Sequence, residues 1–215
     1  MSVAGKICGL STAAAVAASV AGGARFVGFV FYPPSPRDVA IETVAALAQF
    51  VPHGIGKVAV LVDPTDDFLV HLMAKAPLDL LQLHGKETPA RVAAIKDRFR
   101  VAVMKAIPVA ALSDLDAAKP YFGIADWLMF DAKPPRDKTD ALPGGNALAF
   151  DWELLRARRW PLPWMLSGGL DPDNLVAAAT ISGAAVLDVS SGVESAPGIK
   201  DPAKIRAFLA QAGAL

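Results

Sequence analysis

Residues 57–85 read KVAVLVDPTDDFLVHLMAKAPLDLLQLHG and contain the repeating unit of the chain. The branched apolar run at 57–62 is typical of a buried strand, and a second such run occupies 79–84. Between them, Thr65 is placed to cap the start of a helix over 66–75. Two buried strands joined through a helix predict a parallel strand-helix-strand unit.

The same alternation continues on both sides of this unit. Expected strands are 2–7, 26–31, 57–62, 79–85, 101–106, 127–131, 162–166 and 184–189. Expected helices are 13–21, 39–50, 66–75, 89–99, 113–119, 151–159, one beginning at 171–174, and 201–211. These eight pairs average about 27 residues, close to the shortest parallel crossover. We therefore predict one α/β domain, residues 1–215, folded as a single (β/α)8 TIM barrel, with a doubly wound open sheet as the alternative.

The composition of the whole chain limits the kinds of binding partner that we expect. Of the 215 residues 53% are hydrophobic, and 21 basic side chains balance 21 acidic ones. Because no net field attracts nucleic acid or an acidic membrane, and no apolar stretch is long enough to span a bilayer, we expect neither partner. The uncharged run 8–24 resembles the apolar part of a signal peptide, but a single preceding lysine and many alanines favour a helix.

The only cysteine, Cys8, ends an apolar run and precedes Gly9. It cannot form an internal disulfide, which fits a reducing compartment, and we expect a cytoplasmic protein. At the C-terminal end of the first strand its thiol would lie at the edge where ligands bind in parallel α/β folds. The alternative is a buried, inert side chain.

In a barrel, the C-terminal strand ends form one mouth, which would gather Cys8, Arg37, His84, Asp131, residues 167–169 and residues 188–192. Cys8 and Asp131 come from opposite arcs, so each could exchange a proton with a substrate between them. The guanidinium of Arg37 suits a carboxylate. Asp131 could instead cap a loop or pair with Lys133, and Arg37 could be a solvated charge.

Uncrowded backbone N–H groups follow the seventh and eighth strands, where barrels of this kind usually hold phosphate; the residues are Gly168, Gly169, Ser190, Ser191 and Gly192. We therefore expect a small-molecule phosphorylated substrate, although either turn alone could be a plain tight turn. No spacing of His, Cys and carboxylates suggests a metal site. The long irregular segment 133–149 is expected to be a lid or binding loop, or else a plain insertion.

Seven stretches carry a resemblance over nearly the whole chain. They are 6–10 (KICGL), 28–37 (GFVFYPPSPR), 82–85 (QLHG), 131–133 (DAK), 144–145 (GG) with 150–152 (FDW), 167–170 (SGGL) and 188–194 (DVSSGVE). In this order they resemble the phosphoribosylanthranilate isomerases of tryptophan biosynthesis.

The resemblance implies a barrel that converts N-(5′-phosphoribosyl)anthranilate to the 1-deoxyribulose 5-phosphate by an Amadori rearrangement, with no cofactor. It implies that Asp131 protonates the furanose ring oxygen as general acid, and that Cys8 then removes the proton from ribose carbon 2. It also implies that Arg37 binds the anthranilate carboxylate and that Asp188 lies near the bridging amine. His84, at the same mouth, is expected to contact the substrate. The oligomeric state stays open between monomer and homodimer.

Two other functions are possible. A related phosphate-binding barrel such as indole-glycerol-phosphate synthase, a lyase, uses lysine and glutamate at strand ends, whereas Lys105 is expected to have no such glutamate partner. A non-catalytic barrel would bind a phosphosugar without converting it.

Overall fold

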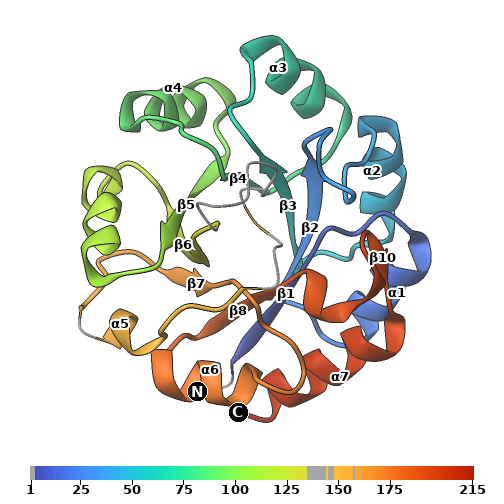
Figure 1. The fold of residues 1–215 in the computed structure, drawn as a ribbon. Coiled ribbons are helices and arrows are strands. Elements are labelled where there is room, and N and C mark those ends of the chain that lie inside the picture. Colours follow the sequence, from blue (N-terminus) through green and yellow to red (C-terminus); the bar gives the residue numbers. More distant parts are fainter. Residues whose placement is uncertain (1–2, 135–143, 145–147, 157) are drawn as a thin grey trace.

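The computed structural model describes residues 3–134, 144, 148–156 and 158–215. Within them, eight parallel strands close into a barrel in chain order, with helices packed around the outside (Figure 1). The first and last strands are paired, so the predicted (β/α)8 barrel is confirmed and the open sheet is wrong. None of the helices described here is long and apolar enough to cross a bilayer.

The barrel strands are β1 (Ala4–Cys8), β2 (Phe26–Phe31), β3 (Gly56–Leu61), β4 (Leu80–Leu83), β5 (Ala102–Val109), β6 (Trp127–Ala132), β7 (Trp164–Leu166) and β8 (Val186–Val189). The helices are α1 (Ala13–Ala21), α2 (Ile41–Leu47), α3 (Asp66–Lys75), α4 (Pro89–Phe99), α5 (Glu153–Arg156), α6 (Leu175–Ser182) and α7 (Pro202–Gly213). Segments of 3-10 helix are η1 (Ala48–Phe50), η2 (Leu112–Tyr121) and η3 (Ser191–Val193), and β9 (Glu194–Ala196) pairs with β10 (Ile199–Lys200).

Two predicted segments differ in kind from the structure. The fifth helix is η2, a 3-10 helix: Asp114 accepts the N–H groups of Ala110 and Ala111 at its start, and Pro120 supplies no backbone donor within it. The helix predicted over 151–159 is reduced to the four residues of α5 in the described part of the chain.

The barrel interior has an apolar floor below a polar upper layer. Its floor consists of Phe26, Val58, Leu80, Met104, Ala106, Met129, Met165 and Val186. Because side chains alternate along a strand, Lys6 and Cys8 of β1 point inward while Gly5 and Ile7 point toward the helices. The floor closes the lower barrel, so the chemistry gathers at the C-terminal strand ends.

The helix α7 packs against β1 through a close fit around Leu209. A Cβ on Gly5 would lie 2.5 Å from Leu209 Cδ2, and one on Gly22, just after α1, would lie 2.6 Å from Leu209 Cδ1. The two glycines therefore make room for one buried leucine where the chain's last helix meets its first strand.

Candidate active site

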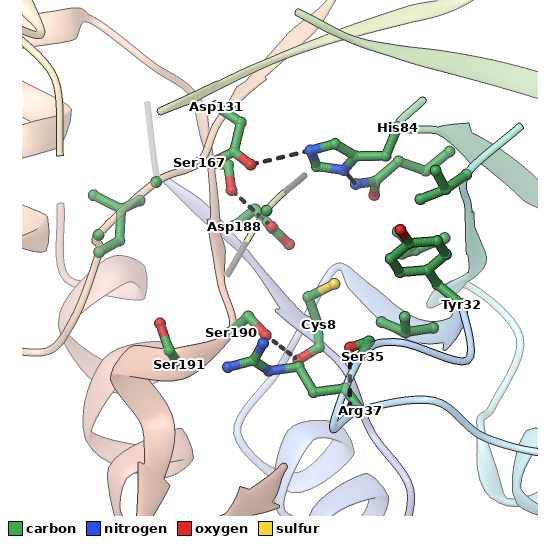
Figure 2. Close-up of a pocket in the computed structure, with 18 residues that line it drawn as sticks. Cys8, Tyr32, Ser35, Arg37, His84, Asp131, Ser167, Asp188, Ser190 and Ser191 are labelled. Atoms are coloured by element: carbon green, nitrogen blue, oxygen red, sulfur yellow. Dashed lines mark hydrogen bonds and ion pairs between the residues drawn. The ribbon is translucent and has the colours of Figure 1, made fainter. Parts of the chain in front are cut away.

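The C-terminal strand ends enclose a pocket of about 680 Å³, its open mouth included (Figure 2). The predicted site residues that line it are Cys8, Arg37, His84, Asp131, Gly168, Gly169, Asp188, Ser190 and Ser191. Tyr32, Ser35 and Gln82 also line the pocket, and sequence analysis gave them no role. The structure thus brings together side chains from strands on every side of the barrel.

The Cys8 thiol stands at the pocket wall at the end of β1 and is 6% exposed. Burial raises its pKa; the neighbouring Lys6 and Lys200 act to lower the pKa, while Asp188 acts to raise it further. The balance favours the neutral thiol near neutral pH, so a role as base requires help from its surroundings.

Asp131 is buried at the end of β6, on the side opposite Cys8. Its Oδ2 lies 3.0 Å from His84 Nε2, and its Oδ1 accepts the N–H of Ala132 at 2.9 Å. The other ring nitrogen of His84 lies 2.9 Å from Gln82 Nε2, so the imidazole connects Gln82 to the carboxyl group (Figure 2). Lys133, the alternative partner weighed for Asp131, forms its ion pair with Asp114.

Asp188 on β8 points into the barrel between two partners. Its Oδ1 is 2.7 Å from Lys6 Nζ, and its Oδ2 accepts the hydroxyl of Ser167 at 3.1 Å. Lys6 is fully buried, and sequence analysis missed it. Strand alternation was the available signal, because it places Lys6 on the same face of β1 as Cys8.

Arg37 is held by Glu194 through two hydrogen bonds, from Nε at 2.8 Å and from Nη2 at 2.9 Å. The same carboxylate accepts Lys200 Nζ at 2.7 Å. All three side chains are buried, so Arg37 is not the solvated charge of the alternative reading. Burial would raise the pKa of Glu194, but Arg37 and Lys200 outweigh it and hold that pKa below its ordinary value. Two cations sharing one carboxylate leave a local positive charge beside the pocket, which favours an anionic ligand.

The loops after β7 and β8 bring four of the five predicted phosphate-binding residues to the pocket. Gly168 and Gly169 have φ values of +95° and +64°, in the region that favours glycine, and both line the pocket. Ser190 and Ser191, after the neighbouring strand β8, line it as well. Gly192 is not among the described lining residues: a Cβ there would lie 2.0 Å from the carbonyl oxygen of Leu170. Its role in phosphate binding stays a prediction.

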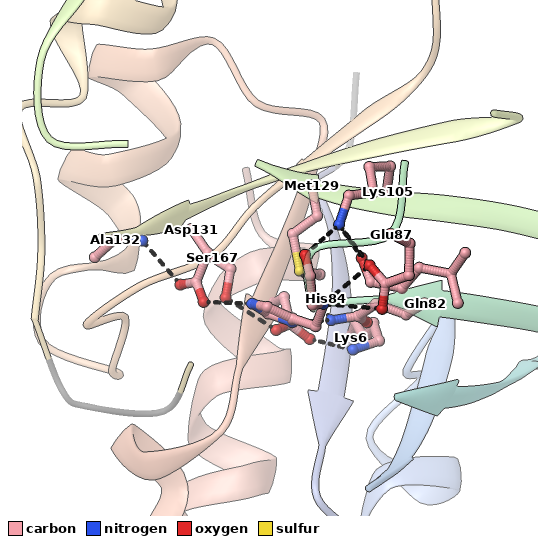
Figure 3. A network of polar contacts seen from close by, with 12 residues as sticks. Lys6, Gln82, His84, Glu87, Lys105, Met129, Asp131, Ala132 and Ser167 are labelled. Atoms are coloured by element: carbon pink, nitrogen blue, oxygen red, sulfur yellow. Dashed lines mark hydrogen bonds and ion pairs between the residues drawn. The ribbon is translucent and has the colours of Figure 1, made fainter. Parts of the chain in front are cut away.

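Lys105 does have a glutamate partner, so that expectation was wrong. Lys105 Nζ lies 2.7 Å from Glu87 Oε2, and Glu87 also accepts the N–H of Gly85 (Figure 3). Neither side chain lines the pocket, because Lys105 points away from the barrel interior on the opposite face of β5 from Met104. The pair ties the loop after β4 to β5 and offers no groups to a bound substrate.

Most of the predicted loop 133–149 lies outside the described residues, so its expected role as a lid stays a prediction. Of its glycine pair, Gly144 is described and lines the pocket, and a Cβ on it would be 2.8 Å from Asp131 Oδ2. In the part of the chain that the structure describes, no three His, Cys, Asp or Glu side chains gather as a group able to hold a metal ion.

The chain is similar to known proteins along its full length. Residues 5–211 match the family model described as N-(5′phosphoribosyl)anthranilate (PRA) isomerase. A curated N-(5′-phosphoribosyl)anthranilate isomerase from Paracoccus denitrificans is 55% identical, over 100% of this chain and 99% of its own.

Two solved structures share the fold. One, of the monomers of a dimeric phosphoribosylanthranilate isomerase from Thermotoga maritima, has a TM-score of 0.84 and 32% identity, covering 99% of this chain and 100% of the other. The second, a phosphoribosyl anthranilate isomerase in complex with reduced 1-(o-carboxyphenylamino)-1-deoxyribulose 5-phosphate, has a TM-score of 0.84 and 31% identity with the same coverage. The chain is therefore an enzyme that belongs to the N-(5′-phosphoribosyl)anthranilate isomerase family.

Proposed function

We propose that the pocket converts N-(5′-phosphoribosyl)anthranilate to 1-(2-carboxyphenylamino)-1-deoxyribulose 5-phosphate, the isomerisation step of tryptophan biosynthesis. The proposal rests on one observation: Cys8 at the end of β1 and Asp131 on β6 line the same pocket, together with the glycine and serine loops that follow β7 and β8. An Amadori rearrangement needs an acid, a base and an anchor for the substrate, and needs no redox partner. Family membership and the solved complex of a relative with the reduced product analogue support the same reaction.

In the proposed first step, Asp131 gives a proton to the furanose ring oxygen, and the C1–O bond breaks to leave a Schiff base. Asp131 must carry that proton beforehand, and its Oδ2 lies 3.0 Å from His84 Nε2. Because both ring nitrogens of His84 already have partners, we assign this residue chiefly to orienting Asp131; a direct contact between His84 and substrate stays a prediction.

In the second step, Cys8 removes the proton from ribose carbon 2, and the electron pair of that C–H bond moves toward the Schiff-base nitrogen to give an enolamine. Tautomerisation then gives the ketone. The two acting groups lie on opposite arcs of the barrel, so one substrate placed between them is reached by both. Asp188 lies between these two groups in the pocket and is proposed to approach the bridging amine (Figure 2).

The substrate's two anionic ends need separate anchors. We assign the anthranilate carboxylate to Arg37, which Glu194 orients and whose surroundings keep a local positive charge. We assign the phosphate to the loops at 168–169 and 190–192. These assignments place the phosphate beside β7 and β8 and the aromatic acid toward β2.

Replacing Cys8 by Ser, or Asp131 by Asn, should lower kcat by at least about 100-fold, the usual weight of a general acid or base, with the fold intact. Substrate fluorescence lost during turnover measures the rate, and circular dichroism checks the fold. Near-normal turnover in either folded variant would remove the role assigned to that residue.

The same assay separates the alternatives. Substrate binding by the wild-type protein without conversion would favour a non-catalytic phosphosugar barrel. Product lacking the carboxylate would favour the lyase, which the position of Lys105 and Glu87 outside the pocket argues against.

We further propose a cytoplasmic enzyme that works as a monomer or homodimer on this small phosphorylated substrate, without nucleic acid. The single cysteine supports a reducing compartment, and the relative from Thermotoga maritima is dimeric. Light scattering of the purified protein would decide between the two oligomeric states.

A further inference from the structure

Lys6 is the largest fully buried side chain whose chemistry the reaction above does not use. It extends inside the barrel from β1, two residues before Cys8 and on the same face of the strand. Its Nζ is 2.7 Å from Asp188 Oδ1 (Figure 3). Burying an ammonium group is costly even when it is paired, so a polar or apolar side chain would fill the space at lower cost.

The space around Lys6 brings its ammonium group close to the thiol. Cys8 is paired with Gly28 across β1 and β2, and a Cβ on Gly28 would lie 3.1 Å from Cys8 Sγ and 3.2 Å from Lys6 Nζ. The missing side chain leaves room for both atoms, so the ammonium and the sulfur lie beside the same glycine. The ammonium is thus hydrogen-bonded to a carboxylate of the proposed site and lies near its thiol.

We propose that Lys6 is a positioning residue that holds Asp188 in place and stabilises the thiolate form of Cys8. The inference rests on the proposed function, in which Cys8 must accept a proton from carbon. A positive charge near the sulfur favours its charged form, and a buried site screens that interaction little.

Other charges act on the same sulfur. Lys200 also favours the thiolate and Asp188 opposes it, while Arg37, Glu194, His84 and Asp131 face the same end of the barrel. Burial would lower the pKa of Lys6, but Asp188 outweighs it with help from Cys8, and the pKa is raised. Lys6 therefore stays charged near neutral pH.

Because Cys8 is the only cysteine, alkylation by iodoacetamide reports on it alone. In Lys6→Met, we expect the midpoint pH of the alkylation rate to rise by at least about one pH unit relative to the wild type. At a pH below the midpoints of both proteins, the variant should therefore be alkylated about tenfold more slowly. In turnover, kcat should fall, its pH profile should shift by the same amount, and KM should change little. A folded K6M protein with the wild-type alkylation profile overturns the proposal.

Two control variants separate the effect of the positive charge of Lys6 from a general structural effect of replacing a buried lysine. Lys6→Arg keeps the positive charge and should restore an alkylation midpoint close to that of the wild type. Lys105→Met removes another buried lysine from an ion pair of the same 2.7 Å length, four strands away on β5, and should leave the midpoint unchanged. A midpoint raised equally in K105M would point to general destabilisation and overturn the proposal.

If K6M does not fold, the wild-type protein provides the test. The 15N resonance of the Lys6 ammonium should shift with the same midpoint as Cys8 alkylation, and Cys8→Ser should abolish that shift. A Lys6 resonance whose chemical shift does not change as Cys8 titrates overturns the proposal. Since alkylation and this resonance need no substrate, failure of the proposed isomerisation would be seen separately, as absent turnover in the wild type.

Discussion

Glu194 keeps two cations at the edge of the pocket in a fixed arrangement. Arg37 and Lys200 would repel each other if buried without it, and both direct hydrogen bonds to its carboxylate. The Glu194 side chain therefore stabilises the fold and also fixes the orientation of the Arg37 side chain, because the guanidinium cannot rotate without losing two hydrogen bonds.

Glu194→Gln should lower the free energy of unfolding by about 3–5 kcal/mol at neutral pH, since it leaves buried positive charges without their counter-charge. Urea denaturation measures this difference. The matched control is Glu42→Gln: Glu42 pairs with Lys75 at an exposed site, and its loss should leave the free energy of unfolding nearly unchanged. Equal effects of the two substitutions would contradict the view that Glu194 acts through a buried network.

Stability should also depend on pH through Glu194. Its pKa is lower in the folded chain than in the unfolded one, so its charge stabilises the fold above the unfolded pKa, and this stability is lost as the pH falls through the folded value. The difference in free energy of unfolding between the wild type and E194Q should have its full size above about pH 5 and should become smaller at lower pH. Urea titrations at several pH values test this, and a gap that stays constant down to acid unfolding would be the contrary result.

Lys6 and Glu194, the two ion-pair partners that sequence analysis missed, share one property. Lys6 meets Asp188 across 182 residues of chain, and Arg37 meets Glu194 across 157. Such pairs depend on barrel register and strand parity, which local patterns do not contain. Cys8, Asp131 and the glycine turns were found because strand ends are visible in the sequence, and a parallel barrel places all of them at one mouth.

At the scale of elements, local signals located the helices well where capping and periodicity agree. The predictions for α1, α3 and α4 match both bounds; Thr65 caps α3 as expected, and Thr88 caps α4. The helical prediction for 113–119 was wrong in type, because the backbone hydrogen bonds that Asp114 accepts and the position of Pro120 favour the tighter 3-10 turn. Propensity alone does not separate the two helix types.

Thr88→Ala should lower the free energy of unfolding by about 1 kcal/mol, because the Thr88 hydroxyl accepts the N–H of Arg91 at the start of α4. Thr180→Ala makes the same chemical change inside α6, where the exposed hydroxyl only bonds back to the carbonyl of Val176. It should leave stability nearly unchanged or slightly raised. Chemical denaturation of both variants checks the difference, and an equal loss in both would show that capping is not the cause.

At the scale of the whole molecule, the barrel is closed by pairing β1 with β8 and covered at that seam by α7. The Ser190 hydroxyl adds a bond across the top of the seam by donating to the carbonyl of Cys8 at 3.2 Å. Below it, Leu209 fills the space beside Gly5 and Gly22. The close packing at this seam therefore helps β1 and β8 to pair and close the barrel.

Leu209→Ala should cost about 2–5 kcal/mol through the cavity it leaves, and Gly5→Ala should destabilise by forcing Leu209 aside. The double variant should be more stable than the sum of the two losses predicts, by at least about 0.5 kcal/mol, because the new methyl group enters the vacated space. Gly213→Ala, where a Cβ meets nothing within 4 Å, is the near-neutral control. Strict additivity in urea denaturation would contradict the fit described at the seam.

The pairing of Lys6 with Asp188 has a consequence for the order of synthesis. A ribosome completes Lys6 and Cys8 long before Asp188, because 181 residues separate the lysine from its carboxylate partner. During translation the thiol and the nearby ammonium precede the strand that encloses them. The pocket therefore forms late, when β8 returns to pair with β1.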